Sequence, residues 1–494
     1  MPLKKLLPAL ISLPPVYARI KSLSASRLAQ LATSQTASPA CADYLGEYFD
    51  TVDPPYGGGY PNPTPLRPCA LSPPRLRRAY GLAEAVESGN DGRGVTIAII
   101  DALRSPTLVS DAQTFAAQFD PKHPLRTSQI TLVDSPSGGD PPTTYDPSTL
   151  SSIYFEQLLD TEWAHGVAPG AHILYVGPPT AGNEDYVAGL NFVVENNLAS
   201  IVSNSLGLDV ETAADSDRSL LDPILIQAGL KGIGLYFASG DSGDNQCGPN
   251  CIFNPAPGDG SISVWYPASS PYVTAVGGTS LFLNAIGRPA YETGFETGDS
   301  VLSGQGATAT WVPGPPGLLL FGAGGGPSQI YSQPKYQRGI VPVTLAGSLP
   351  ARVIPDVAML ADADSGVYCA LTDPLVGSYV VYAGCGGTSL ATPLFAATVA
   401  LAEQRAGHRL GFANPKFYRH ALTAFRDITP TQSPQSIASV VGGWTDTEDP
   451  PNLQVMRPDG TIVPHTLHSA PGFDNVTGLG VPKGETFLEV ISGQ

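Results

Sequence analysis

The sequence predicts an α/β fold in which a mostly parallel sheet is flanked by helices on both faces. Short runs of apolar, often β-branched residues indicate strands that are buried on both faces, and stretches of helical character lie between them. Repeated strand–helix–strand order requires crossover connections, which cover a parallel sheet with helices on both sides. Functional residues of such sheets gather at the carboxyl ends of the strands.

The expected elements follow one another from residue 95 onwards. Strands are expected at residues 95–100, 172–176, 201–203 and 234–238. Helices are expected at residues 151–165 and 184–196, and one long helix follows the segment Gly386–Pro393. A region rich in proline and glycine comes after that helix, and the chain contains no internal repeat.

The composition excludes some classes of protein. The 494 residues include 26 Lys and Arg against 43 Asp and Glu, a net charge of −17, which argues against binding of nucleic-acid phosphates. No apolar run approaches the roughly 20 residues that a membrane-spanning helix needs. Only 14% of residues are charged, which limits the charge repulsion that builds up in acid. We expect a monomer that binds neither nucleic acid nor membranes.

The N-terminus has features of a secretory signal peptide. Lys4 and Lys5 precede a largely apolar stretch at residues 6–13, and Ala18 offers a cleavage site, although three prolines interrupt the apolar stretch. We therefore assign residues 1–18 as a signal peptide, residues 19–75 as an N-terminal extension and residues 76–494 as the main domain. A secreted, extracellular protein is the expectation.

The six cysteines also favour a location outside the cytosol, because disulfides persist in oxidising compartments. Spacing favours pairing in sequential order, although fifteen pairings are open. The sequential pairs are Cys41–Cys69, Cys247–Cys251 and Cys369–Cys385. Buried free thiols are the alternative, and a zinc site is disfavoured because no histidine flanks Cys247 or Cys251.

The segment Gly386-Gly387-Thr388-Ser389-Leu390-Ala391-Thr392-Pro393 is the strongest local motif. It places Ser389 in the first turn of a helix, where free backbone N–H groups and the helix dipole favour negative charge. Such a position can activate a nucleophile and help to hold an oxyanion. An ordinary N-cap serine is the alternative. The Gly-Thr-Ser-x-x-x-Pro pattern resembles the nucleophile motif of subtilase-like serine peptidases.

A nucleophilic serine needs a base, and the chain has no His-Gly-Thr tripeptide. His165 lies in a context that follows the catalytic histidine of subtilisins, so we interpret it as non-catalytic. Glu156 and Asp160 are four residues apart and therefore share one face of the expected helix. A solvated acidic face is the alternative, but apolar neighbours interrupt it. Two carboxyls that share a proton can act as a base and its orienting group in acid.

Asp241 follows the apolar strand at residues 234–238. A neutral carboxylic acid there could donate a hydrogen bond to an oxyanion. The same stretch contains Gly-Asp-Ser-Gly around Ser242, which invites comparison with trypsin-like peptidases. We reject Ser242 as a nucleophile because Asp244 follows the motif and no Ala-Ala-His-Cys element is present.

Together these residues resemble the sedolisin family of serine-carboxyl peptidases. The similar segments run in family order: PPRLRRAYG at 73–81, Ser203 to Gly207, YPASSPYVTAVGGT at 266–279, GGGPSQIYSQPKYQ at 324–337 and PDVA at 355–358. The resemblance implies a subtilisin-like α/β fold and a serine-type endopeptidase that hydrolyses proteins or peptides in acid. Its implied catalytic residues are Ser389 as nucleophile, Glu156 as general base, Asp160 as its orienting group and Asp241 in the oxyanion hole.

The resemblance also implies substrate-binding and metal-binding residues. Ser205, Leu206 and Gly207 are expected to bind the substrate, and the glycines at 322–326 are interpreted as a loop of the substrate groove. One structural Ca²⁺ is expected near the C-terminus, where all-oxygen ligation suits a hard cation. Its expected ligands are the carboxylates of Asp427 and Asp474 and the carbonyl oxygens of Ile428, Ala470 and Gly472. A pair of turn aspartates is the alternative.

Two alternatives stay open at the level of function, and a subtilisin-type enzyme comes third because no placed histidine serves it. A tripeptidyl exopeptidase would use the same catalytic residues as an endopeptidase. A catalytically silent, secreted binding protein could retain the fold. Family members begin with a long folded prosegment, which the first 70 or so residues do not resemble, so autoactivation is in doubt.

Overall fold

The computed structural model confirms the predicted α/β fold with its mostly parallel sheet. It describes residues 70–136, 144–207, 209–211, 215–243, 263–284, 286–304, 310–314, 317–429, 437–441, 452–456 and 467–494. The central sheet has eight strands in the order β15-β8-β6-β4-β1-β3-β2, all parallel, with β9 antiparallel to β8. These strands are β1 Thr96–Ile100, β2 Ile130–Asp134, β3 His172–Gly177, β4 Ile201–Asn204, β6 Gly234–Ala238, β8 Thr274–Leu283, β9 Pro289–Gly294 and β15 Val357–Leu360.

The central strands are buried on both faces, as their continuous apolar sequences predict. In β1, Ile97 and Ile99 join one hydrophobic core, whereas Ala98 and Ile100 join the other. This alternation follows the two-residue period of a strand. All four strands expected from the sequence therefore lie within one residue of their predicted bounds at each end.

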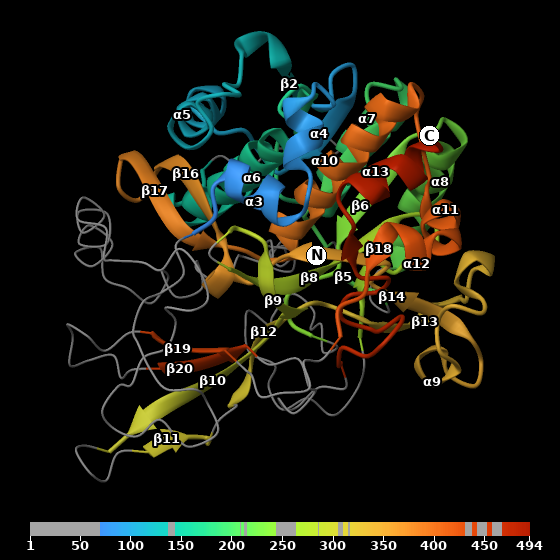
Figure 1. Cartoon of the computed structure of the whole chain (residues 1–494). Coiled ribbons are helices and arrows are strands. Elements are labelled where there is room, and N and C mark those ends of the chain that lie inside the picture. Colours follow the sequence, from blue (N-terminus) through green and yellow to red (C-terminus); the bar gives the residue numbers. More distant parts are fainter. Residues whose placement is uncertain are drawn as a thin grey trace, which may run out of the picture.

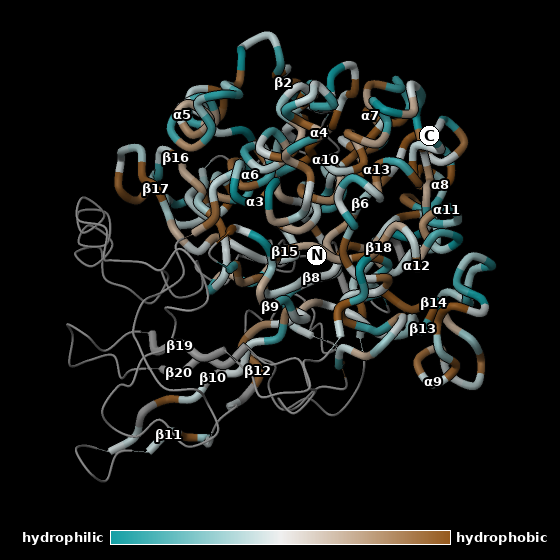
Figure 2. The backbone as a smooth tube through the Cα atoms, in the orientation of Figure 1, coloured by the Kyte–Doolittle hydropathy of each residue, from teal (hydrophilic) through white to brown (hydrophobic). Residues whose placement is uncertain are grey.

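Two layers of helices cover the sheet (Figures 1 and 2). On one face, the larger core contains residues of α3 Pro73–Ala79, α4 Ala83–Glu87, α5 Leu108–Phe119, α6 Pro147–Val167, α10 Thr388–Ala406 and α13 Glu485–Ser492. On the other face, α7 Asn183–Glu195 and α8 Asp215–Leu230 contribute to the second core. Most residues of α6 and α10 are buried, which identifies these two as interior helices.

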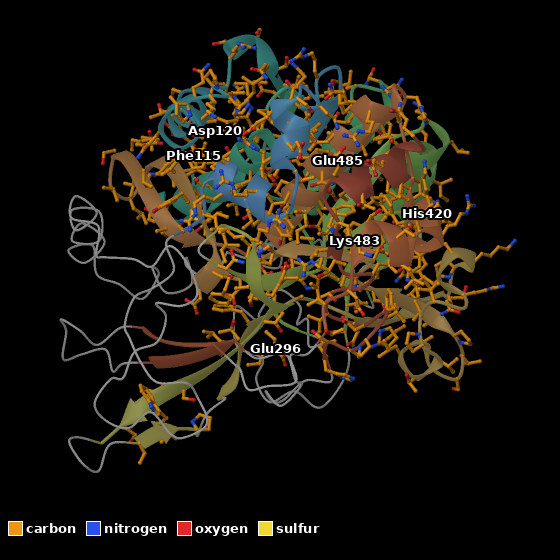
Figure 3. All side chains as sticks on the ribbon, viewed as in Figure 1. Phe115, Asp120, Glu296, His420, Lys483 and Glu485 are labelled. Atoms are coloured by element: carbon orange, nitrogen blue, oxygen red, sulfur yellow. A yellow bond between two sulfur atoms is a disulfide. The ribbon has the colours of Figure 1, made fainter. Side chains whose placement is uncertain are left out.

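Buried and surface ion pairs join helices that are distant in the sequence. The Arg77 guanidinium in α3 lies 2.7 Å from Asp120, just after α5, and donates to the Gly166 carbonyl oxygen in α6 at 2.5 Å. Glu485, at the start of α13, lies 2.6 Å from Arg405 of α10; Figure 3 labels Asp120 and Glu485. No helix in the ranges given above is both long and apolar enough to cross a bilayer.

Several short helices and strand pairs lie around this body. The helical ones are α9 Val343–Ala346, α11 Asn414–Arg419, α12 Ala421–Ala424, η2 Thr127–Gln129, η4 Lys335–Gln337 and η5 Ala363–Ser365. The short strand pairs are β5 Asp209–Val210 with β7 Trp265–Tyr266, β13 Gly326–Ser332 with β14 Ala351–Ile354, and β18 Phe425–Arg426 with β21 Val481–Pro482.

A second sheet, which the sequence analysis did not anticipate, lies to one side of the central sheet (Figure 1). We call it the accessory sheet. Its strands are β10 Glu296–Ser303, β11 Thr310–Val312, β12 Leu318–Gly322, β19 Ile437–Val441 and β20 Asn452–Met456. The last two come from the proline- and glycine-rich region, and β20 pairs with β10 across a long sequence separation.

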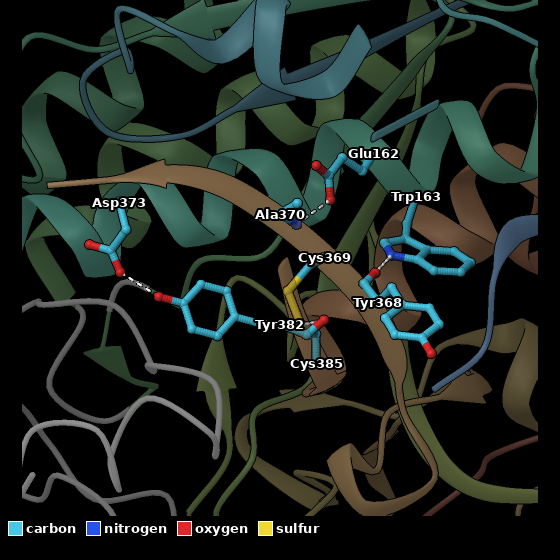
Figure 4. Close-up of a disulfide and its surroundings, with 8 residues drawn as sticks. All are labelled: Glu162, Trp163, Tyr368, Cys369, Ala370, Asp373, Tyr382 and Cys385. Carbon is cyan, nitrogen blue, oxygen red and sulfur yellow. Dashed lines mark hydrogen bonds between the residues drawn. A yellow bond between two sulfur atoms is a disulfide. The ribbon is translucent and has the colours of Figure 1, made fainter. Parts of the chain in front are cut away.

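A disulfide-linked hairpin packs on α6 (Figure 4). Strands β16 Val367–Asp373 and β17 Ser378–Cys385 form the hairpin, and the predicted Cys369–Cys385 disulfide joins them. The Trp163 indole N–H donates to the Tyr368 carbonyl oxygen at 2.9 Å, and Glu162 accepts from the Ala370 N–H at 3.1 Å. The other four cysteines, the signal peptide at 1–18 and residues 19–69 of the extension lie outside the described residues.

Removing the disulfide should destabilise the fold. A crosslink that closes a loop of about 16 residues contributes roughly 3 kcal/mol by restricting the unfolded chain. We expect the Cys369→Ala/Cys385→Ala variant to lose about 2–4 kcal/mol of unfolding free energy in urea titrations. As a control, dithiothreitol should abolish the difference between wild type and variant, because both then lack the Cys369–Cys385 bond. Equal stability of the two oxidised proteins would contradict the prediction.

Candidate active site

Polar residues converge where three adjacent central strands end. Asp101 follows β1, Ser205 follows β4 shortly after its last residue, and Asp241 lies in the loop after β6. Because these parallel strands are neighbours in the sheet, their carboxyl ends share one edge. Helices α6 and α10 pack against each other above this sheet and bring further polar side chains to the same edge.

Ser389 occupies the second position of α10, as its motif predicts. The helix begins at Thr388 after Gly387, whose φ of +104° lies in a region that side chains other than glycine rarely adopt. A Cβ atom on Gly386 would lie 2.3 Å from the Ala361 carbonyl oxygen, so this position also requires glycine. The two glycines therefore let the chain turn sharply from β17 into the helix that carries Ser389.

Glu156 and Asp160 lie one turn apart on α6, and both are buried, which rules out a solvated acidic face. The Ser205 hydroxyl lies 2.9 and 2.8 Å from the two carboxylate oxygens of Asp160, and 3.1 Å from the Ser389 carbonyl oxygen. Ser205 thus links the carboxyl pair on α6 to the backbone of the serine on α10.

The Glu156 carboxyl lies close to Ser389, although neither side chain has a hydrogen bond of normal geometry within the described ranges. Burial raises the pKa of Glu156 well above its usual range, the nearby Asp101 carboxylate raises it further, and the Ser389 hydroxyl lowers it. Burial is also the main reason that the pKa of Asp160 is raised, followed by the charges of Asp101 and Glu156. The pair therefore holds protons in mild acid.

Asp241 faces the start of α10. Its Oδ1 accepts hydrogen bonds from the Thr388 N–H at 2.7 Å and from the Thr388 hydroxyl at 2.9 Å. Burial raises the pKa of Asp241 to about 6, against the lowering effect of these two bonds. The side chain is consequently neutral in acid and able to donate a hydrogen bond.

Asp101 is a buried carboxyl that the sequence analysis missed. Burial raises its pKa to about 7, and its charge acts on both Glu156 and Asp160. The sequence did contain the signal, because Asp101 directly follows an apolar strand, as does the loop of Asp241. The site thus contains three carboxyls that act on one another, Asp101, Glu156 and Asp160, in addition to Asp241.

The two rejected catalytic candidates lie apart from these contacts. The His165 imidazole is buried beside the His123 carbonyl oxygen at 2.9 Å, and burial lowers its pKa to about 4. Ser242 forms a β-bridge with Gly322 through its backbone. Neither residue contacts Ser389 in the hydrogen bonds of the described chain.

The expected substrate-binding residues differ in exposure. The Ser205 side chain is buried on Asp160, whereas Leu206 and Gly207 are half-buried. The glycine loop at 322–326 contacts the loop that carries Asp241. The Gly322 N–H donates to the Asp241 carbonyl oxygen at 3.0 Å, and the Gly324 N–H donates to the Gly240 carbonyl oxygen at 2.6 Å. The accessory sheet, through β12, therefore supports the backbone beside Asp241.

The expected calcium ligands include two carboxylates that face the same short segment. Asp427 accepts from the Gly472 N–H at 2.8 Å, and Asp474 accepts from the Ala470 N–H at 3.2 Å. No cluster of three or more Asp, Glu, His or Cys side chains is present in the described part of the chain. Carboxylate and carbonyl oxygens are the donors that suit a hard cation. Both oxygens of the buried Asp474 carboxyl also accept hydrogen bonds, from Ala470, Val476 and Thr477.

Replacing Asp101 should make the protein more stable at neutral pH. The raised pKa means that the folded protein holds this proton more tightly than the unfolded chain, so stability falls as pH rises from about 4 to 7. At pH 7.5, Asp101→Asn should raise the free energy of unfolding by a few kcal/mol relative to the wild type. At pH 4, the free energies of unfolding of the two proteins should be similar. Urea titrations at both pH values test this, with the exposed Asp134→Asn as control. Equal pH dependence in Asp101→Asn and wild type would refute it.

Comparisons with known proteins identify the family of this chain. The model of the subtilase family matches residues 150–427, which is more than half of the chain. Kumamolisin of Bacillus sp. is 30% identical over 86% of this chain, sedolisin of Pseudomonas sp. is 32% identical over 53%, and tripeptidyl-peptidase 1 of Bos taurus is 27% identical over 60%. The chain spans 64%, 40% and 44% of their respective lengths.

A solved structure of Pseudomonas sedolisin, a serine-carboxyl proteinase complexed with pseudo-iodotyrostatin, has the same fold. The two structures superpose with a TM-score of 0.64 at 22% identity, covering 86% of this chain and 99% of the other. The match to the family model covers the helix of Glu156 and Asp160 and the helix of Ser389. The chain therefore belongs to the subtilase family and, within it, to the sedolisins.

Proposed function

We propose that the protein is a secreted serine-carboxyl peptidase that hydrolyses peptide bonds in acid. The main support is the convergence of Ser389, the Glu156–Asp160 pair and Asp241 at one edge of the sheet, with Ser205 bridging Asp160 to the serine backbone. A nucleophile, a base with an orienting group and an oxyanion donor are the parts that acyl transfer requires.

In the first half of the reaction, the Ser389 Oγ attacks the carbonyl carbon of the peptide and its proton passes to Glu156. The Asp160 carboxyl orients Glu156 and shares its charge. The carbonyl oxygen gains negative charge and accepts a hydrogen bond from neutral Asp241. Collapse of this intermediate breaks the C–N bond, and Glu156 returns the proton to the leaving amine.

In the second half, water attacks the acyl-enzyme. Glu156 accepts a proton from the water, and the same oxyanion contact forms again. Breaking the bond between the acyl carbon and Ser389 Oγ releases the carboxylic acid product, while the proton on Glu156 restores the serine hydroxyl. Leu206 and Gly207 supply half-buried backbone at the end of β4, where an extended substrate can pair.

We propose endopeptidase activity on protein or peptide substrates by a monomer. Tripeptidyl-peptidases also occur among the relatives, so release of tripeptides is the second candidate. We further propose one structural Ca²⁺ held by the carboxylates of Asp427 and Asp474 and the carbonyl oxygens of Ile428, Ala470 and Gly472. Such an ion would fix the loop at 470–474 against the end of β18.

Activity should be confined to acid and should require Ser389. Burial raises the pKa of Asp241 to about 6, so its donated proton is lost as pH rises through that value and the rate falls. We expect hydrolysis of a denatured protein between pH 2.5 and about 6, and at least about a 10³-fold loss in Ser389→Ala. Ser242→Ala is the matched control and should keep its activity.

The products of a defined peptide separate the candidate specificities. Internal cleavage of a peptide with a blocked N-terminus supports an endopeptidase, whereas release of N-terminal tripeptides from the unblocked peptide alone supports the second candidate. No acid hydrolysis by folded, calcium-supplied wild type would favour the catalytically silent binding protein. Activity that depends on Ser389 but peaks near pH 8 would rule out the carboxyl-based mechanism.

Calcium should stabilise the fold. Ligand at about 100 times its dissociation constant contributes roughly 2.7 kcal/mol, so chelation with EGTA should lower the melting temperature by several degrees. Asp427→Asn should weaken this response, and Asp134→Asn should retain it. If calcium and EGTA leave the melting temperature of the wild type unchanged, the site does not bind the ion.

A further inference from the structure

The contacts of Asp241 are unequal at its two oxygens. Oδ1 accepts both the Thr388 N–H and the Thr388 hydroxyl, whereas Oδ2 has no hydrogen-bond partner within the described chain. The free oxygen points toward the turn before the nucleophile, because a Cβ atom on Gly387 would lie 3.0 Å from Oδ2 and 3.6 Å from the Ser389 Cβ. The two oxygens of one buried carboxyl thus have different surroundings.

The direction of the Thr388 hydroxyl proton is fixed by a third group. The Gly240 N–H donates to the Thr388 Oγ1 at 3.1 Å, so this oxygen already acts as an acceptor. Its own hydrogen is then available for Asp241 Oδ1 at 2.9 Å. A backbone N–H and a hydroxyl both aimed at Oδ1 make that atom the carbonyl oxygen of a neutral carboxylic acid, since a proton on it would face two donors.

We infer that Thr388 is a positioning residue that confines the proton of Asp241 to Oδ2, the oxygen that faces the reacting carbonyl. The inference rests on the proposed function, in which neutral Asp241 donates to the oxyanion. No proton leaves Asp241 in this step: the Oδ2–H bond stays intact and its hydrogen is shared with the oxyanion. Thr388 acts through Asp241 and does not touch the substrate.

Other carboxyls lie near Asp241, and their charges can also influence its pKa. Glu156 faces it from α6, and Asp160 and Asp101 act on Glu156 or on each other from the next turn of α6 and from the end of β1. Asp362 follows Ala361, whose carbonyl oxygen accepts the Gly387 N–H. The Asp362 carboxyl accepts a hydrogen bond from the Ser280 hydroxyl at 2.5 Å and is therefore bonded away from Asp241. These groups are unchanged by a substitution at Thr388, so a shift in the pH profile reports on Asp241 through the lost hydroxyl.

The test is the pH dependence of kcat/KM for Thr388→Val. Hydrogen bonds to the ionised carboxylate lower its pKa, so loss of the hydroxyl should raise that pKa and move the alkaline limb of the profile up by about one pH unit. With one donor left at Oδ1, the proton also visits that oxygen, and kcat at pH 4 should fall roughly 3- to 10-fold. Thr388→Ser should restore both values.

A matched control and a second readout separate the outcomes. Thr398→Val changes the same residue type in α10, where its hydroxyl donates to the Leu394 carbonyl oxygen at 2.8 Å, and should leave the limb in place. Titration of the Asp241 carboxyl by ¹³C NMR in Ser389→Ala, with and without Thr388→Val, needs no activity and should show the same upward shift.

The role of Thr388 is overturned if the alkaline limb of the kcat/KM profile stays at the same pH or moves to lower pH in folded Thr388→Val. It is also overturned if the pKa of Asp241 measured by NMR does not change. In that case wild-type activity in acid that is lost in Ser389→Ala still supports the proposed function. Conversely, wild type without acid activity contradicts the proposed function while the NMR titration still reports whether Thr388 controls the proton of Asp241.

Discussion

Carboxyl groups removed from water favour their neutral form, and one edge of the central sheet holds four of them: Asp101, Glu156, Asp160 and Asp241. None takes part in the ion pairs of the described residues, and burial is the main cause of each raised pKa. Asp160 instead accepts hydrogen bonds from the Ser205 hydroxyl, and Asp241 accepts them from the Thr388 N–H and hydroxyl. The fold therefore accommodates this edge most easily when most of its carboxyls carry protons, and this preference is the physical reason that the proposed reaction belongs to acid.

Helix α6 connects this edge to Ser389 in two ways. Glu156 and Asp160 lie on it, and the next two turns hold the hairpin of β16 and β17 through Glu162 and Trp163. The hairpin ends at Cys385, four residues before Ser389. One helix thus fixes both Glu156 and the strand that leads into Ser389, so the separation of these two residues depends on packing within a single buried unit.

Local patterns in the sequence predict much of this structure. Continuous apolar runs identify β1, β3, β4 and β6 because each strand is buried on both faces, and paired glycines before Thr388 identify the turn into α10. The expected pair of Cys369 and Cys385 is also confirmed, because a hairpin brings residues at that spacing together. Predictions of this kind depend on neighbours along the chain.

Two features that the sequence analysis did not predict, the accessory sheet and Asp101, also have physical explanations. The accessory sheet depends on pairing between β10 and β20, which lie about 150 residues apart, and no short-range pattern encodes such a register. Asp101 stands in no recognisable motif, whereas Glu156 and Asp160 share a helix face and Asp241 lies in a glycine-rich stretch. The sequence analysis therefore did not select Asp101. Its effect on Glu156 and Asp160 arises because the end of β1 lies close to α6 in the fold, and the linear sequence does not show this proximity.

The Ser205 hydroxyl contact has a consequence for the newly made chain. It joins Ser205 to Asp160 across 45 residues and to Ser389 across 184 residues. Closing loops of this length costs entropy that only the completed core can offset. A nascent or partly folded chain therefore lacks the assembled groups, and Ser205, Asp160 and Ser389 come together only when the core is complete.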